Sequence, residues 1–446
     1  MKARNVLQQR KVVLLITLLA AFAMVFSACA TPAAPAAPDE AAEAGGEAAP
    51  EGDTGALEIF SWWTSGGEVE ALNALYDIFA QEYPDAEIQN AALAGGAGQG
   101  GNMKALLETR MMGGEPPDSF QVHLGRELID SHVIADRMEP LDFLYEEEGF
   151  YDVFPADLIE IASYEGRPYS VPVNIHRSNV MWYRTDKLDE VGMEAPTTWE
   201  EFFVVADALA EAGISALAVA ECEPGNFAHV FENILVATMG NDGYRGLFDG
   251  TVGWDDEGVT KALETANAAL DYANPDYLST CWGDVNDKYV SDDGPAMMIM
   301  GDWTHGVLKA KGFETYHWAP APDTAGTFVV LSDSFGLPKN APSRDNAVNF
   351  LRIVGSQAGQ DAFNPPKGSI PARTDADTSV YDEYQLEAMS DFSSNDLVPS
   401  IQHGAAAKQS FVLDYDFAIN NLATNRDVAT AQAMLVQAAE DAAFGE

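Results

Sequence analysis

Short apolar strands alternate with amphipathic helices early in the chain, and this alternation limits the possible fold more than any other feature. The apolar pattern predicts strands over residues 56–62, 87–93 and 119–123, separated by helices over 69–83 and 102–112. Consecutive strand–helix units build parallel sheets that are covered by helices on both faces. We therefore predict an α/β fold with its ligand site at the carboxyl ends of the strands.

Further helices are predicted in the rest of the chain. Thr198 and Glu201 have the spacing of a capping box at the start of a helix. Apolar periodicity predicts other helices over 226–239, 257–272, 343–359 and 427–443. A body of about 390 residues is too large for one hydrophobic core, so we expect two such lobes with the binding cleft between them.

The first 28 residues have the layout of an export signal. Four cations precede an apolar run from Val12 to Phe26 that is short for a membrane span. The run ends at Phe26-Ser27-Ala28-Cys29, which resembles a bacterial lipoprotein box, while ordinary secretory cleavage beside an incidental cysteine is the alternative. We expect lipidation of Cys29 and anchoring to the outer face of the cytoplasmic membrane, at the cell surface or in the periplasm.

Residues 29–55 connect this expected anchor to the folded body. After the cysteine they are mostly Ala, Pro, Gly and acidic residues, without Lys or Arg. Such a segment has too few large apolar residues to build a core. We therefore expect a disordered acidic linker.

The chain is strongly acidic, with 24 basic and 70 acidic residues and a formal net charge of −46 at pH 7. This charge repels a phosphate backbone and an anionic membrane surface. We therefore expect no nucleic-acid partner, and a lipid anchor is the only membrane contact that the sequence indicates.

Cys222 and Cys281 are the two cysteines that remain beyond the expected anchor. An exported protein reaches an oxidising environment in which disulfides form and persist. The sequence leaves open whether these cysteines form a bridge or stay as two buried thiols.

The sequence motifs give little support to an enzyme or a metal centre. The glycine-rich segment 94–101 contains a GxGxxG pattern, but Asp118 precedes its strand instead of ending it, so a loop at the cleft rim is favoured over a dinucleotide site. The seven histidines form no HxxxH or HExxH motif, so a zinc site would require the fold to bring them together. The many acidic residues leave a two-carboxylate glycosidase open.

Tryptophans stand at positions where predicted elements end. Trp62 and Trp63 end the first strand, Trp282 follows Cys281, and Trp303 follows an apolar segment. Core packing is one explanation for each of them. Aromatic faces also stack on the C–H faces of sugar rings, and carboxylates, amides, imidazoles and amines bond to the sugar hydroxyl groups. This mixture of residues favours a carbohydrate site.

Five segments give the chain a family resemblance that covers nearly the whole body. They are 59–68 (IFSWWTSGGE), 114–123 (GEPPDSFQVH), 300–303 (MGDW), 333–335 (DSF) and 366–373 (PKGSIPAR). With them, the chain resembles the extracellular solute-binding proteins of bacterial sugar importers that are powered by ATP-binding cassettes. It is most similar to the glucose-type branch (glucose/galactose, mannose), which is related to maltose-binding proteins.

The resemblance implies the periplasmic-binding-protein fold, in which two α/β lobes are joined by three hinge crossovers and enclose the ligand cleft. The crossovers are expected near 171–174, 329–333 and 364–368. The N-terminal lobe then comprises 56–172 plus 334–364, and the C-terminal lobe comprises 173–333 plus 365–446.

The resemblance also implies which residues form the sugar pocket. Trp303 is expected to stack on the pyranose ring opposite Trp63, and the polar residues are expected to bond to its hydroxyl groups. The implied residues are Trp62, Trp63, Glu68, Gln121, His123, Trp282, Trp303, Asp333, Lys367 and His403.

The expected function is capture of a monosaccharide by hinge closure and its delivery to the permease subunits of an importer. Glucose is the first candidate, followed by galactose and mannose. We expect a monomer that needs no cofactor and catalyses no reaction. The alternatives are a binder of a di- or trisaccharide, an exported glycosidase with a carboxylate pair such as Glu68 and Asp333, and a metal or oligopeptide receptor on the same lobes.

Overall fold

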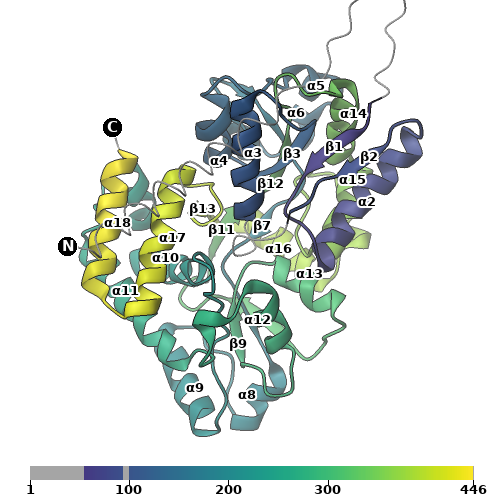
Figure 1. Cartoon of the computed structure of the whole chain (residues 1–446). Coiled ribbons are helices and arrows are strands. Elements are labelled where there is room, and N and C mark those ends of the chain that lie inside the picture. Colours follow the sequence, from purple (N-terminus) through teal and green to yellow (C-terminus); the bar gives the residue numbers. More distant parts are fainter. Residues whose placement is uncertain (1–54, 94–99, 445–446) are drawn as a thin grey trace, which may run out of the picture. The chain divides into compact units, whose positions relative to one another are not determined.

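The computed structural model describes residues 55–93 and 100–444, which belong to one compact unit (Figure 1). The expected export signal, Cys29, nearly all of the linker and most of the glycine-rich segment lie outside the described residues. Within the described ranges, no helix has both the length and the apolar character that crossing a membrane would require.

A five-stranded sheet contains the strands that the sequence predicts first. Its order is β2 (Ile88–Asn90), β1 (Leu57–Phe60), β3 (Ser119–His123), β12 (Asp333–Gly336) and β6 (Ser170–Pro172). Helices α2 (Gly66–Glu82) and α3 (Gly101–Gly113) follow β1 and β2. The predicted alternation of strands and helices is therefore confirmed in this part of the chain.

The sheet is mixed, so the prediction of parallel sheets is only partly right. Strand β1 pairs in parallel with β2 and β3, whereas β12 runs antiparallel to β3 and β6. A local strand–helix–strand unit imposes parallel pairing because its helix crosses over the sheet. Strand β12 enters from a distant part of the chain, so no such crossover fixes its direction.

Two three-stranded sheets are also mixed or antiparallel. In one, β8 (Val180–Tyr183) lies antiparallel between β10 (His317–Pro320) and β9 (Met297–Ile299). In the other, β11 (Thr327–Leu331) lies between β13 (Asp396–Pro399), which is parallel to it, and β7 (His176–Arg177), which is antiparallel. Strands β4 (Ser163–Tyr164) and β5 (Arg167–Pro168) form a separate hairpin.

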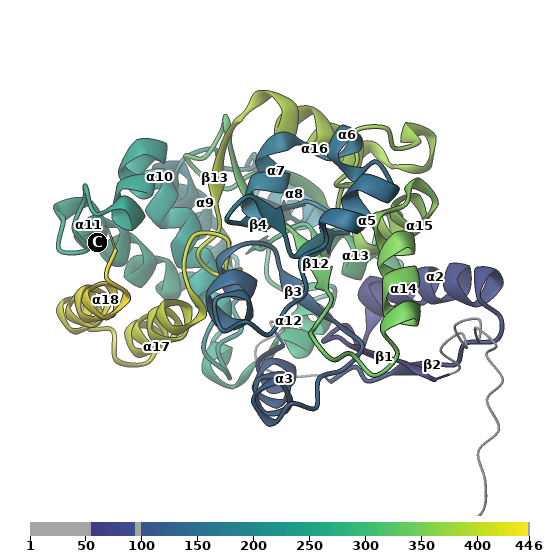
Figure 2. The same cartoon turned by 90° about the horizontal axis from the view of Figure 1, so that it is seen from above.

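The helices cover these sheets, and α17 and α18 pack side by side in both views (Figures 1 and 2). The remaining helices are α4 (Arg126–Leu128), the π-helix Ile129–Val133, α5 (Asp142–Glu147), α6 (Phe150–Val153), α7 (Ala156–Ile161), α8 (Thr185–Val191), α9 (Trp199–Glu211), α10 (Asn226–Asp249), α11 (Glu257–Ala269), α12 (Trp282–Tyr289), α13 (Trp303–Ala310), α14 (Arg344–Gly355), α15 (Gln357–Lys367), α16 (Glu383–Ser394), α17 (Gln409–Asn425) and α18 (Val428–Ala442), with short 3₁₀ turns at Leu270–Tyr272, Tyr277–Ser279 and Thr378–Val380.

Three helix predictions need correction in detail. Helix α10 continues past 239 through a kink at Gly240, and the single helix predicted over 343–359 is two helices separated at Ser356, which caps α15. At α9, Thr198 accepts a hydrogen bond from the Glu201 N–H as predicted. The Glu201 carboxylate, however, accepts hydrogen bonds from Thr197 instead of from the Thr198 N–H. The second hydrogen bond of the predicted capping box is therefore not formed.

The buried apolar residues form two clusters. One includes Ile59, Phe120 and Phe335 from the five-stranded sheet. The other includes Phe231 of α10 and Tyr415 of α17. Two separate cores agree with the expectation that a body of this size does not fold around one core.

The chain leaves the five-stranded sheet after β6, enters a three-stranded sheet at β7, and returns between β11 and β12. These connections lie side by side, since Asn174 Nδ2 donates to Asp333 Oδ2 at 2.9 Å. The end of α15 joins them, because Asn364 Nδ2 donates to the Val173 carbonyl at 3.1 Å. The predicted lobe boundaries stay predictions.

Cys222 and Cys281 form a disulfide, with their Cα atoms 5.1 Å apart. Cys222 lies in the segment before α10, and Cys281 directly precedes Trp282, the first residue of α12. The bridge therefore ties together the N-terminal ends of two helices.

Replacing both cysteines, in a Cys222→Ser/Cys281→Ser variant, should lower the free energy of unfolding. The bridge spans 59 positions, and chain-entropy estimates for a closed loop of this length give about 4 kcal/mol as an upper value. Urea unfolding followed by tryptophan fluorescence measures the change. Reduced wild-type protein serves as the control, and an unchanged urea midpoint in both proteins would show that the bridge adds no stability.

Candidate functional site

The described residues line a small cavity with about 40 Å³ of space for the centres of water-sized molecules. Nine of the ten predicted pocket residues line it, all except Gln121. They come from the ends of elements, because Trp62 and Trp63 follow β1, His123 ends β3, and Trp282 and Trp303 begin α12 and α13. Glu68, Asp333, Lys367 and His403 complete the predicted set.

Gln121 lies behind the cavity wall and only 1% of its surface is exposed. Its Nε2 donates to Asp333 Oδ1 at 3.0 Å, and its Oε1 accepts from Ser61 Oγ at 2.8 Å and from the Trp62 N–H at 3.2 Å. The structure therefore places Gln121 as a support for Asp333 and for the segment that carries Trp62.

Five residues line the cavity that sequence analysis did not single out. They are His176, Asn226, His229, Met300 and Leu331. Asn226 and His229 are polar residues three positions apart in a helix whose next turn also contains the polar residues Glu232 and Asn233. Polar residues on one face of a buried helix are a signal that could have identified this pair. The sequence around His176, Met300 and Leu331 contains no comparable signal.

The aromatic rings of the cavity pack against one another, and the Lys367 ammonium group lies over one of them. The Trp303 ring centroid lies 4.9 Å from that of His403, 5.3 Å from His176 and 5.6 Å from His229. Lys367 Nζ lies 5.3 Å from the Trp63 ring centroid. Trp63 has no solvent exposure, whereas Trp303 is half-buried. Trp303 therefore offers more of its surface to a solute than Trp63 does.

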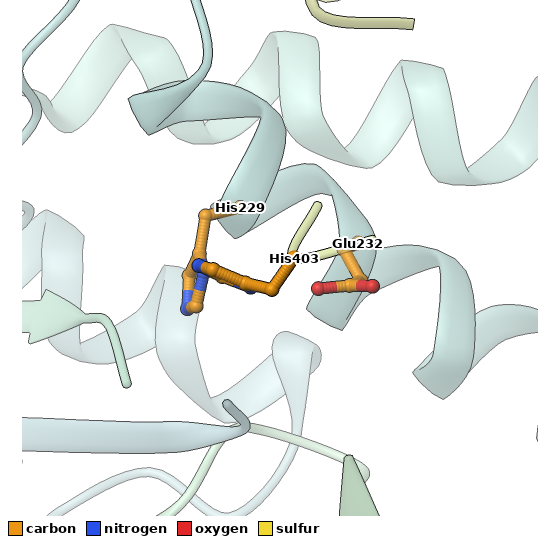
Figure 3. A group of neighbouring side chains, drawn as sticks. All are labelled: His229, Glu232 and His403. Carbon is orange, nitrogen blue, oxygen red and sulfur yellow. The ribbon is translucent and has the colours of Figure 1, made fainter. Parts of the chain in front are cut away.

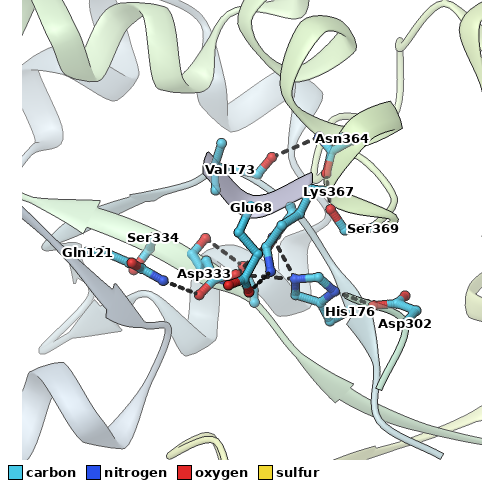
Figure 4. Close-up of polar contacts among 12 residues, drawn as sticks. Glu68, Gln121, Val173, His176, Asp302, Asp333, Ser334, Asn364, Lys367 and Ser369 are labelled. Atoms are coloured by element: carbon cyan, nitrogen blue, oxygen red, sulfur yellow. Dashed lines mark hydrogen bonds and ion pairs between the residues drawn. The ribbon is translucent and has the colours of Figure 1, made fainter. Parts of the chain in front are cut away.

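Lys367 and Glu68 form an ion pair at the cavity, with Nζ and Oε1 2.9 Å apart (Figure 4). Lys367 ends α15, and Glu68 lies in the first turn of α2. The Lys367 side chain is only 3% exposed and that of Glu68 is 16% exposed. Little water reaches this pair, so their attraction is stronger than that of a surface pair.

Helices α2, α13 and α15 meet at glycines close to this ion pair. A Cβ atom at Gly67 would lie 2.1 Å from the Pro366 carbonyl oxygen, and one at Gly306 would lie 2.5 Å from the Lys367 carbonyl oxygen. Only glycine allows this approach of backbone to backbone. The glycines therefore bring Glu68, Lys367 and Trp303 to one cavity.

Asp333 is fully enclosed by hydrogen-bond donors and cations. Besides Gln121 and Asn174, His176 Nε2 lies 3.2 Å from Asp333 Oδ2. Burial alone would raise the pKa of Asp333, but the bond from His176 and the charge of Lys367 outweigh it and hold the pKa well below its usual range. Asp333 is therefore a permanent carboxylate.

His176 lies between two carboxylates (Figure 4). Its Nδ1 is paired with Asp302 and its Nε2 faces Asp333. Burial favours the neutral ring and lowers the pKa, but the charge of Asp302 acts in the opposite direction, and the net pKa of His176 is raised. Asp302 also accepts from the Arg177 N–H at 3.0 Å, so this carboxylate fixes both the ring and the backbone of β7.

His123 is held by a buried carboxylate on the side away from the cavity. Its Nδ1 lies 2.7 Å from Glu127 Oε2, which also accepts from Lys104 Nζ at 2.8 Å. Since a carboxylate only accepts, Nδ1 carries the proton. His123 Nε2 is then an acceptor when the ring is neutral.

His229, Glu232 and His403 offer donor atoms within 4.8 Å of one another, a set that could hold a metal ion (Figure 3). The Glu232 carboxylate, however, already accepts from Tyr244 Oη at 3.0 Å, from Ser400 Oγ at 2.9 Å and from the Ile401 N–H. A metal ion would have to displace these bonds. They indicate that Glu232 anchors the turn that carries His403.

A cavity that is lined by aromatic rings and fixed polar groups in an α/β fold is typical of a small-molecule site. The chain belongs to the bacterial extracellular solute-binding protein family, whose model matches residues 63–361.

Two relatives support this membership. An uncharacterised extracellular-binding protein of an ABC transporter from Pyrococcus horikoshii is 35% identical over 387 residues, 86% of this chain and 87% of the relative. The xylose/arabinose-binding protein XacG of Haloferax volcanii is 28% identical over 360 residues, 78% of this chain and 77% of the relative.

Solved structures identify the fold as the two-lobed periplasmic-binding-protein fold, which confirms the predicted α/β two-lobed class, while the three hinge crossovers stay a prediction. A chitin oligosaccharide binding protein matches with a TM-score of 0.77 at 17% identity, covering 88% of this chain and 99% of the other. The bacterial solute receptor AcbH, described as preferring β-D-galactopyranose exclusively, matches with a TM-score of 0.77 at 18% identity, covering 87% and 98%.

Glu127 should make folding stability depend on pH. Burial raises the pKa of Glu127, but Lys104 and His123 lower it more, to about 2 in the folded protein from 4.5. The stabilisation is therefore present above pH 4.5 and is lost as the pH falls towards 2. Replacing this carboxylate in Glu127→Gln should lower the free energy of unfolding at pH 7 by up to about 3 kcal/mol.

Urea unfolding at pH 7 and pH 3 measures this effect. The exposed Glu264→Gln on α11 is the control and should leave both midpoints unchanged. Equal losses at the two pH values in Glu127→Gln would contradict the proposed charge pairing.

Proposed function

We propose that this protein is the solute-binding lipoprotein of an ABC-type carbohydrate importer and that it captures a monosaccharide, with glucose as the first candidate and galactose or mannose next. The observation that carries the proposal is the convergence of Trp303, Lys367 and Asp333 on one cavity. An aromatic face stacks on a pyranose ring, while a fixed ammonium and a fixed carboxylate bond to its hydroxyl groups.

The size of the cavity favours a monosaccharide. One water molecule needs at least about 10–15 Å³ in this measure, so about 40 Å³ has room for only a few. The lining therefore has to move outwards for any sugar, and a single ring requires less movement than two or three rings. XacG is named for xylose and arabinose, and AcbH is described as preferring β-D-galactopyranose, whereas the chitin oligosaccharide binding protein keeps a di- or trisaccharide as the alternative.

The proposed mechanism is hinge closure. Trp62, Glu68 and His123 belong to the predicted N-terminal lobe, and Trp282 and Trp303 to the predicted C-terminal lobe. A sugar that contacts both groups binds the closed form more tightly and shifts the population towards it. The closed form would then dock on the permease subunits, while Cys29 anchors a monomeric protein to the outer face of the membrane.

A glycosidase that uses Glu68 and Asp333 as its carboxylate pair receives no support from the electrostatics. A general acid of such an enzyme needs a raised pKa so that it keeps its proton near neutral pH. The pKa of Asp333 is lowered instead, and Glu68 is paired with Lys367. Neither carboxylate has the surroundings of a general acid.

Titration with a sugar panel tests the proposal. The mature chain, residues 29–446 with Cys29→Ser to prevent lipidation, should bind a monosaccharide one-to-one with a dissociation constant near micromolar, about −8 kcal/mol. Trp303→Ala should weaken binding about tenfold or more, because the stacking face is lost. Calorimetry with parallel tryptophan fluorescence measures both.

Trp318→Ala is the matched control, because Trp318 is also half-buried but does not line the cavity. Its affinity should equal that of the wild type. Full affinity in Trp303→Ala would remove the stacking role. Absence of binding to all mono-, di- and trisaccharides would remove the sugar assignment, and hydrolysis of a sugar would favour the enzyme.

A further inference from the structure

The first turn of α10 presents Asn226 and His229 to the cavity. They stand three positions apart, so their side chains lie on the same face of the helix. Asn226 is 5% exposed and His229 is 1% exposed. The pair is therefore a fixed, buried part of the cavity wall.

Each of these side chains has one polar atom without a hydrogen-bond partner, namely Asn226 Nδ2 and His229 Nδ1. Buried polar atoms are nearly always paired, since an unpaired one costs free energy. Two such atoms belong to residues in the wall of one cavity, where a solute could supply the missing partners.

The chemical character of the two atoms follows from their surroundings. His229 Nε2 lies 3.0 Å from the Ser178 carbonyl, which only accepts, so the proton is on Nε2 and Nδ1 keeps its lone pair. Burial lowers the pKa of His229 to about 4, so the ring stays neutral at pH 7. The amide Nδ2 of Asn226 is a donor. The wall thus offers one donor and one acceptor.

The pair is rigidly held beside the expected stacking surface. Glu221 accepts from the Phe227 N–H at 2.8 Å and secures the start of α10. The His229 ring centroid lies 5.6 Å from that of Trp303. A pyranose stacked on Trp303 would therefore lie close to the start of α10.

We propose that Asn226 and His229 recognise the hydroxyl groups at one edge of the bound pyranose, with Asn226 Nδ2 donating to a hydroxyl oxygen and His229 Nδ1 accepting a hydroxyl proton. This inference rests on the proposed sugar-binding function and adds two residues that determine specificity. A hydroxyl group both donates and accepts, so it satisfies such a pair. A C–H group in its place leaves both protein atoms unpaired. The pocket therefore selects against a sugar that lacks this hydroxyl.

The test uses the mature chain, residues 29–446 with Cys29→Ser, and the monosaccharide that it binds best, together with the 2-, 3-, 4- and 6-deoxy analogues of that sugar. The wild type should bind at least one analogue about 100-fold more weakly than the parent sugar. Calorimetry measures each affinity.

Two variants assign this discrimination to the pair. His229→Gln can keep a donor for the Ser178 carbonyl while removing the Nδ1 acceptor, and Asn226→Leu keeps the size of the side chain while removing the donor. Each should weaken binding of the parent sugar about tenfold or more and reduce the penalty for the affected deoxy analogue. His132→Gln is the control, because His132 is buried but does not line the cavity.

The outcomes separate this inference from the proposed function. A wild type that binds no sugar overturns both. A wild type that binds the parent sugar, together with variants that keep the same affinity and the same deoxy pattern, overturns the role of the pair alone. The deoxy pattern is compared within each folded variant, as judged by circular dichroism, so a general loss of stability does not imitate the expected result.

Discussion

The carboxylate of Asp333 is the group on which the arrangement of the site depends. It is the first residue of β12, where the chain enters the five-stranded sheet, and it accepts hydrogen bonds from Gln121 of β3 and from Asn174 in the segment between β6 and β7. His176 connects it further to Asp302, directly before Trp303. The buried Asp333 carboxylate thus connects the five-stranded sheet with the sheet that contains β7, and through Asp302 with α13, which begins at Trp303. Removing it would leave His176 with Asp302 alone and Lys367 with Glu68 alone, in a region of low dielectric constant where each buried charge needs compensation.

The sequence predicted the elements that local patterns define. Strand β3 has the predicted bounds 119–123, and the starts of α2, α3 and α18 lie within a few residues of their predicted positions. Strand direction was not predictable in the same way. The antiparallel pairing of β12 depends on a partner about 210 positions away, and no local periodicity contains that information. The division at Ser356 was missed because apolar periodicity continues across it from α14 into α15.

The site residues divide along similar lines. The family resemblance supplied residues that stand in recognisable segments, and the structure brings nine of them to one cavity. Gln121 shows the limit of this approach, because a residue in the right motif lies one layer behind the wall. Asn226 and His229 were missed because α10 was predicted from its apolar periodicity alone, without regard to the polar residues among the apolar ones. Only the fold reveals that this turn of the helix faces the cavity instead of the core.

The glycine contacts among α2, α13 and α15 have a mechanical consequence. At Gly67 and Gly306 the helices touch through their main chains, with no side chain between them that could change rotamer and absorb a displacement. Such a contact between main chains limits how closely the helices approach. It is formed at one distance between the helices and is lost at any larger distance. A single methyl group at Gly306 would work as a wedge at this junction and hold Trp303 away from Glu68 without altering either residue. The geometry of the cavity is therefore set in part by atoms that never touch its contents.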